Sequence, residues 1–311
     1  AQELAKLVPQ DTKLMLLHSA FLSSDRERQE DALQKLIGKH GQRPQRMFVI
    51  GTQVLEQSLD IDFDVLYTDI APMDLILQRA GRLHRHQINR PPTLKTPQVY
   101  VMGINKFGEY GDGNQAVYPK YLLMKTDYFL KNEIILPNDI SKLVQEVYDS
   151  QNDNQIIGIS DAKADFSSKI ESEKRKANTF QIDKPNYRSD ATIHGWLDHD
   201  QKDVDRDEQK AVAAVRDIKE TLEVILLQHT KIGDFLLDRR CLADVTSQEI
   251  AKQTIRLPVA VTPRIDKAIN SLESLTSKYY PQWQESKWLH GSLALPLDEN
   301  LSAKLGNWKL K

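Results

Sequence analysis

Short apolar runs alternate with amphipathic stretches over residues 1–105, and this alternation constrains the fold more than any other feature of the sequence. Four runs have the length and composition of buried strands: residues 13–17, 46–50, 65–70 and 99–102. Residues 25–37 and 73–80 are expected helices, with Asp25 as the cap of the first and Pro72 before the second. Strands separated by helices predict a parallel sheet with flanking helices, that is, an α/β fold.

The composition changes further along the chain, and we expect four segments. They are an α/β domain (1–108), a helical extension of it (109–150), a polar and partly disordered linker (151–210) and a small α+β domain (211–311). Helices are expected at 122–130 and 139–148, a long exposed helix at 161–177, and a last helix near 264–279. Proline residues punctuate the final segment, which is typical of a small mixed domain.

The overall charge and the cysteine content exclude several classes of protein. A net charge of −2 excludes a histone-like polycation but allows a local basic groove. The single cysteine, Cys241, cannot form an internal disulfide and fits a reducing cytoplasm. No apolar run is long enough to span a membrane, and the first residues do not resemble a signal peptide. The first residue is not Met and falls inside an expected helix, so we expect a fragment of a longer protein.

Charges are segregated in the middle of the first domain. Residues 47–78 contain six acids and no Lys or Arg, whereas residues 75–108 contain six bases and no acid. The acids are Glu56, Asp60, Asp62, Asp64, Asp69 and Asp74; the bases are Arg79, Arg82, Arg85, Arg90, Lys95 and Lys106. One interpretation is a solvated helix face followed by a basic loop. The other is a basic groove that binds an anion, with an affinity for DNA that falls steeply as salt rises.

Three of the arginines favour the second interpretation. Arg79, Arg82 and Arg85 are spaced to lie near one face of the helix that begins at Met73. Guanidinium groups with no acid among them repel one another, and a polyphosphate would relieve that repulsion because it matches the planar fork of arginine. Gly81 would let a ligand or a partner backbone come close.

A second candidate site follows the strand 46–50. Gly51 and Thr52 end this strand, which places the Thr52 hydroxyl at the carboxyl edge of the sheet, where ligands of open α/β sheets bind. Thr52 and nearby amides can hold a phosphate, and Asp60 can accept a hydrogen bond from a ribose hydroxyl. The alternative is a strand followed by a polar turn.

Taken together, residues 51–86 (GTQVLEQSLDIDFDVLYTDIAPMDLILQRAGRLHRH) resemble motifs V and VI of superfamily 2 helicases. In detail they resemble the CRISPR-associated nuclease-helicase of type I systems, which carries Ser where many helicases have Gly, here Ser58. His18 and Ser19, followed by Asp25, resemble the preceding motif of that family. The resemblance implies a second RecA-like lobe followed by a C-terminal accessory domain.

The resemblance also implies a role for each matching residue. His18, Ser19, Thr52 and Gln53 would contact the backbone of single-stranded DNA. Asp60, Gln78 and Arg79 would contribute to nucleotide binding. Arg82 and Arg85 would be arginine fingers that reach the γ-phosphate of ATP, a role worth about 10³–10⁵ in rate in other phosphoryl-transfer enzymes.

The phosphate-binding half of an ATP site is absent from the sequence. No G-x-x-x-x-G-K-[ST] loop occurs in the 311 residues, and Asp207-Glu208 does not follow the apolar strand that a Walker B box requires. His199-Asp200 lacks the other ligands of a nuclease metal centre, and Asp60-x-Asp62-x-Asp64 lacks the Gly and Glu of a calcium loop, so no metal site is expected.

The resemblance therefore implies an ATP-dependent DNA helicase of which this chain is one part, inactive as an ATPase by itself. ATP with Mg²⁺ would be the cofactor, and the Mg²⁺ ligands would lie on a first RecA-like lobe. The implied partners are single-stranded DNA, that first lobe, a histidine–aspartate nuclease domain, and a CRISPR surveillance complex with its guide RNA. Two alternatives stay open: a different superfamily 2 motor, or a regulatory module that binds nucleic acid without hydrolysing ATP.

Overall fold

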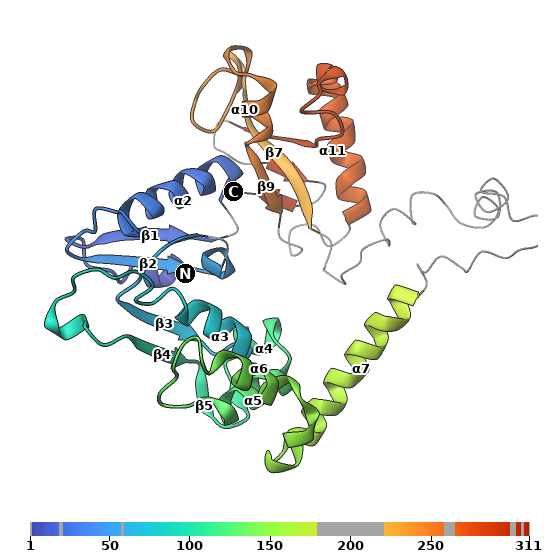
Figure 1. Ribbon diagram of the computed structural model, residues 1–311. Helices are drawn as coiled ribbons and strands as arrows, with labels where there is room; N and C mark the ends of the chain where they lie inside the picture. Colours follow the sequence, from blue (N-terminus) through green and yellow to red (C-terminus); the bar gives the residue numbers. More distant parts are fainter. Residues whose placement is uncertain are drawn as a thin grey trace, which may run out of the picture. The chain divides into compact units, whose positions relative to one another are not determined.

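The computed structural model describes residues 2–18, 21–56, 59–178, 221–257, 265–298, 303–305 and 308–310 (Figure 1). Two compact units emerge from its internal contacts: Ala1–Leu66 with Gln78–Val99 and Lys219–Lys311, and Tyr67–Leu77 with Tyr100–Ile218. The grouping joins the two ends of the chain in one unit, and the domain ranges expected from composition stay a prediction. Ser19 and the expected linker beyond Asn178 lie outside the described residues.

The amino-terminal part of the first unit pairs two strands in parallel. It contains α1 (Gln2–Ala5), β1 (Lys13–Leu17), α2 (Ser23–Ile37), β2 (Met47–Gly51) and the 3₁₀ helix η1 (Gln53–Glu56). The register runs from Lys13 opposite Met47 to Leu17 opposite Gly51, so both strands end at the same edge. The core behind them consists of five buried side chains: Met15, Leu17, Leu33, Ile37 and Ile61.

The expected cap of α2 is wrong. The helix begins at Ser23, with Leu22 at the cap position and no side-chain cap bond, so Asp25 lies in the first turn. An acid there still interacts favourably with the helix dipole. Asp25 also forms an ion pair with Arg28, one turn further on. Leu22 is buried, and this burial accounts for an apolar residue at a position that usually carries a polar one.

The second unit is built around buried helices. It takes residues from β3 (Val65–Asp69), α3 (Met73–Ala80) and β4 (Gln98–Met102), and β3 pairs with β4; the 3₁₀ helix η2 (Pro92–Leu94), between α3 and β4 in sequence, belongs to the first unit. It continues through β5 (Ile104–Lys106), β6 (Glu109–Tyr110), α4 (Asp112–Val117), α5 (Lys120–Phe129), α6 (Ile140–Tyr148), η3 (Ser150–Gln155) and α7 (Ile159–Asn178). Met73 and Leu77 pack with Leu123, Leu143 and Val147 in its core. Within the described residues, the expected sheet appears as two separate strand pairs, β1–β2 and β3–β4.

The carboxyl-terminal part of the first unit is a small mixed domain, as the sequence predicts. Its sheet has the order β10 (Ala294–Leu297), β7 (Leu222–Thr230) and β8 (Gly233–Phe235), and β9 (Thr254–Leu257) also pairs with β7. Helices α10 (Ser247–Ala251) and α11 (Ile265–Tyr279), 3₁₀ helices η4 (Leu242–Asp244) and η5 (Pro281–Glu285), and a short pair β11 (Ala303–Leu305) and β12 (Trp308–Leu310) complete it. β10 runs parallel to β7, whereas β8 and β9 run antiparallel to it.

Candidate functional site

The parallel strands β1 and β2 bring two of the predicted DNA-contacting residues to one edge. His18 follows Leu17 and Thr52 follows Gly51, and these preceding residues are partners in the register. The backbone amide of Thr52 donates to the Leu17 carbonyl over 3.1 Å, and the Thr52 side chain is exposed. The His18 ring stacks on Phe21 at 4.4 Å between centroids. Gln53 begins η1 directly after this edge.

The three arginines do not share one helix face, and this expectation is wrong. α3 ends at Ala80, so only Arg79 is helical. Beyond Gly81 the main chain pairs with Phe63, whose amide donates to the Arg82 carbonyl over 2.9 Å and whose carbonyl accepts from the His84 amide over 3.0 Å. This tertiary pairing takes the main chain out of helical geometry.

Arg79 and Gln78 join the end of α3 to η1. The Arg79 guanidinium contacts Glu56 Oε1 through Nε at 2.8 Å and Nη2 at 2.5 Å. Gln78 Nε2 donates to the Glu56 carbonyl over 3.0 Å. Both predicted nucleotide-contacting side chains are therefore engaged with one residue that lies 23 positions before Arg79.

Among the candidate residues whose burial the structure describes, Arg82 is the most buried. Its side chain is nearly inaccessible, and Nη1 donates to the Leu59 carbonyl. Burial lowers its pKa below the ordinary arginine value, and the charge of Arg85 lowers it further, whereas Glu56 and Asp60 oppose the shift. The guanidinium still stays protonated at neutral pH, because arginine is always charged in proteins.

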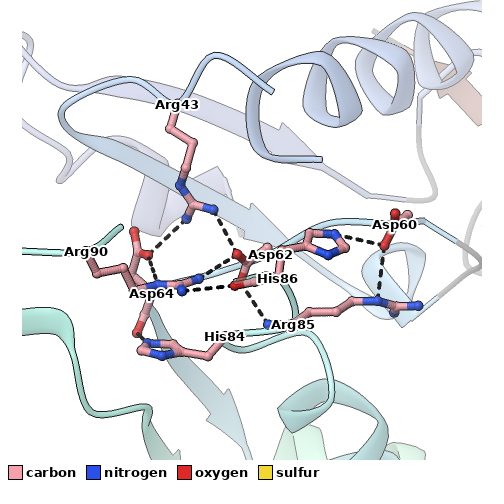
Figure 2. Close-up of polar contacts among 8 residues, drawn as sticks. All are labelled: Arg43, Asp60, Asp62, Asp64, His84, Arg85, His86 and Arg90. Carbon is pink, nitrogen blue, oxygen red and sulfur yellow. Dashed lines mark hydrogen bonds and ion pairs between the residues drawn. The ribbon is translucent and has the colours of Figure 1, made fainter. Parts of the chain in front are cut away.

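Asp60 lies between two basic side chains. Its Oδ1 is 3.1 Å from Arg85 Nε and 3.1 Å from His86 Nε2 (Figure 2). Asp60 and Arg85 are each 46% exposed, so both remain accessible to a ligand. The predicted ribose acid and one predicted arginine finger are thus direct neighbours.

A second acid–base cluster lies beside this pair and contains Asp62, Asp64, Arg43 and Arg90. Figure 2 shows the two guanidiniums facing the two carboxylates. Arg90 contacts Asp62 Oδ2 at 2.5 Å and Asp64 Oδ1 at 2.8 Å, and Arg43 contacts the same oxygens at 3.2 and 3.0 Å. Sequence reasoning counted these acids in the acidic stretch and weighed a calcium-loop resemblance, but it missed their pairing with Arg43 and Arg90.

The expected mutual repulsion of the three arginines is reduced, since Arg79 pairs with Glu56 and Arg85 pairs with Asp60, although the charge of Arg85 still lowers the pKa of Arg82. Within the described residues, no group of three or more His, Cys, Asp or Glu side chains is arranged to hold a metal ion.

Comparisons with known proteins match both ends of the chain to one protein family. A family model described as "CRISPR-associated nuclease/helicase Cas3, C-terminal" matches residues 1–88, and one described as "Cas3 C-terminal domain" matches residues 216–311. The CRISPR-associated nuclease/helicase Cas3 of Streptococcus thermophilus is 40% identical over 96% of this chain. The chain belongs to the Cas3 family.

Further relatives and solved structures extend the same result. The Thermus thermophilus endonuclease/helicase Cas3 is 37% identical over 56% of the chain and 20% of its own length. The crystal structure of T. fusca Cas3 superimposes with a TM-score of 0.71 at 25% identity, covering 97% of this chain and 34% of that one. This chain spans about a third of the S. thermophilus Cas3, 34% of its length, and corresponds to the C-terminal helicase part of the family.

The first Cas3 family match contains every candidate site residue, from His18 to Arg85. The individual roles of these residues stay predictions. Within the described residues, no helix is both long enough and apolar enough to cross a membrane.

Proposed function

We propose that this chain is the second RecA-like lobe and the C-terminal accessory domain of an ATP-dependent helicase. The enzyme would translocate on single-stranded DNA, unwind the target duplex and help degrade it in type I CRISPR interference. The observation that carries the proposal is the ion pair between Asp60 and Arg85, close to the buried Arg82. All three residues lie within the range matched by the first Cas3 family model.

The geometry supports ATP as the cofactor. The crystal structures of T. fusca Cas3-ATP and T. fusca Cas3-ADP match this chain at 25% identity, with TM-scores of 0.72 and 0.70. In our proposal Arg82 and Arg85 supply positive charge to the γ-phosphate, and Asp60 accepts a ribose hydroxyl. The phosphate loop and the Mg²⁺ ligands would come from the first RecA-like lobe.

The ion pair of Asp60 and Arg85 has to separate for both residues to act. Because both side chains are half exposed, their pairing contributes only about 0–1 kcal/mol, and a polyphosphate can replace Asp60 as the partner of Arg85 at little cost. Arg79 is more enclosed, with 18% of its side chain exposed, and keeps two contacts to Glu56. We propose that Arg79 holds η1 against α3 while Arg85 exchanges partners.

The edge formed by β1 and β2 supports a DNA track. Thr52 is exposed beside the end of β1, and His18 presents an aromatic ring at the same edge. Hydroxyl groups, imidazoles and backbone amides are common phosphate contacts in protein–DNA complexes. The proposed partners are single-stranded DNA, the nuclease domain and a guide-RNA surveillance complex.

The proposal is tested in the enzyme that contains this chain together with a phosphate-loop lobe. We expect Arg82→Ala and Arg85→Ala each to lower the ATPase kcat in the presence of single-stranded DNA by about 10³-fold or more. Arg256→Ala, at an exposed arginine of the C-terminal domain, is the control and should leave kcat unchanged. Retention of parental turnover by both finger variants would contradict the assignment.

The 311-residue chain alone should show negligible ATP hydrolysis, because it has no phosphate loop. A coupled phosphate-release assay with single-stranded DNA measures this. DNA-stimulated turnover by the isolated chain, abolished by Arg82→Ala, would show that the ATP site is complete without the first RecA-like lobe.

A further inference from the structure

We propose that Asp62 and Arg90 are positioning residues that hold the main chain of Arg85 in place for catalysis. The inference rests on the proposed function and deepens it, since it names the groups that orient one finger. Neither residue belongs to the set that the sequence resemblance assigns to nucleotide or DNA. Both are nearly inaccessible, with 0% of the Asp62 side chain and 7% of the Arg90 side chain exposed.

Asp62 is the central acceptor of the cluster. Its Oδ1 accepts a hydrogen bond from the Arg85 backbone amide over 3.0 Å. Its Oδ2 accepts from Arg90 and from Arg43. One carboxylate therefore ties the main chain of the finger to two guanidiniums, and its own amide donates to the Ile37 carbonyl over 3.0 Å.

Arg90 holds the other side of the same main chain. Its Nη1 donates to the His86 carbonyl over 3.2 Å while Nε and Nη2 contact Asp64 and Asp62 (Figure 2). All three nitrogens of the guanidinium are used, and each has a different acceptor residue. A lysine ammonium is a single point charge and cannot span three such acceptors.

The main chain just before Arg85 is strained and needs this support. His84 has a φ of 50°, in the left-handed region that a residue with a side chain rarely adopts. Its amide is held by the Phe63 carbonyl at 3.0 Å, and its Nε2 lies 3.2 Å from the Asp64 carbonyl. Such a conformation persists only where the surroundings determine it, and it is characteristic of functional sites. The left-handed conformation of His84 directs the chain so that the Arg85 amide donates its hydrogen bond to Asp62.

Charge balance explains why the cluster can be buried. Two carboxylates face two guanidiniums, and every contact among them is a charge-assisted hydrogen bond. Asparagine at position 62 would keep the shape of the side chain but turn an amide donor toward either the Arg85 amide or the two guanidiniums. One set of donors would then lose its acceptor, and the finger would shift.

The test measures kcat and KM for ATP in the enzyme that contains this chain and a phosphate-loop lobe. We expect Asp62→Asn and Arg90→Lys to lower kcat by about 10²-fold, the effect of displacing a catalytic group by about 1 Å, with KM near the parental value. Matched controls are Asp238→Asn and Arg256→Lys, at exposed ion pairs of the C-terminal domain, and both should keep the parental kcat. Arg90→Lys retains the charge and serves if Asp62→Asn does not fold.

Double variants separate positioning from a general loss of structure. In the Arg85→Ala background, Asp62→Asn or Arg90→Lys should cause no further loss of kcat, because the group that they position is gone. A multiplicative loss in that background, or a parental kcat for the folded single variants, would overturn the positioning role alone. A parental kcat for Arg85→Ala would overturn the finger assignment as well, so the two failures are distinguishable.

Discussion

The salt dependence of DNA binding should be far weaker than the row of bases from Arg79 to Lys106 suggests. Six bases and no acid lie between residues 75 and 108. If all six neutralised phosphates of single-stranded DNA, the logarithm of the association constant would fall with the logarithm of salt with a slope of about −4. Between about 50 and 200 mM salt, the affinity would then drop about 300-fold.

The structure reduces this expectation, because at least four of the six bases form ion pairs with carboxylates. The pairs join Arg79 to Glu56, Arg85 to Asp60, Arg90 to Asp62 and Asp64, and Lys106 to Glu109. At most two bases then contribute to counterion release, which gives a slope of about −1.4 and a loss of only about sevenfold over the same range. A base that leaves its acid for a phosphate changes little, because the acid then takes up a cation from solution.

Fluorescence anisotropy with a labelled oligothymidine, titrated at several potassium chloride concentrations, measures the slope. Glu56→Gln should steepen it by about 0.7, since the charge of Arg79 is no longer cancelled, whereas Lys95→Gln should make it shallower by about 0.7. Glu273→Gln, at an exposed acid of α11, is the matched control and should leave the slope unchanged. A slope that Glu56→Gln does not alter would refute the reasoning that the acidic stretch neutralises the basic one.

Three further predictions concern buried and capped charges. Lys125→Met should lower the free energy of unfolding by about 3 kcal/mol in urea titrations, because Lys125 is fully buried and pairs with Asp153 at 2.8 Å. The control Lys142→Met, at the exposed ion pair with Glu146, should change this free energy by less than about 0.5 kcal/mol. Burial alone would raise the pKa of Asp153, but hydrogen bonds, first that from Lys125, hold this pKa below its ordinary value. The stability from this carboxylate is therefore present above about pH 4 and is lost as the pH falls further. Asp153→Asn should make the free energy of unfolding depend less on pH in this acid range. Hydrogen bonding, first from the Thr246 amide and then from the Arg240 side chain, lowers the pKa of Glu249 to about 2; an NMR titration of its carboxyl should show this value rise part of the way toward the ordinary one in Arg240→Gln, because the Thr246 amide remains.

Local pattern was sufficient to predict most elements of the first domain. The strand at Lys13–Leu17 and the helix at Met73–Ala80 have the expected bounds, because an isolated apolar run and a proline before an apolar-periodic stretch are local signals. The pairing of β1 with β2 follows from the α/β alternation, and it places His18 beside Thr52 as expected for one sheet edge.

The positions of Arg82 and Arg85 could not be predicted by the same reasoning. Their spacing continues that of Arg79, although the helix ends at Ala80, directly before Gly81, a residue common after the last turn of a helix. The course of the main chain beyond Gly81 depends on bonds between the Arg82–His84 segment and Phe63, about 20 residues earlier in the chain. A contact of this kind is tertiary and does not follow from local spacing.

The burial of Asp62 also depends on distant partners, since Arg43 lies 19 residues before it and Arg90 lies 28 residues after it. The sequence nevertheless carries a signal: Asp60, Asp62 and Asp64 alternate with Ile61 and Phe63, a period of two that turns the apolar residues to the core and the acids to the opposite side. Equal numbers of acids and bases in neighbouring stretches then favour mutual pairing over a shared anion. The case for a phosphate ligand therefore depends on Arg82, enclosed beside Asp60, and on Arg85, whose half-exposed ion pair can separate at little cost.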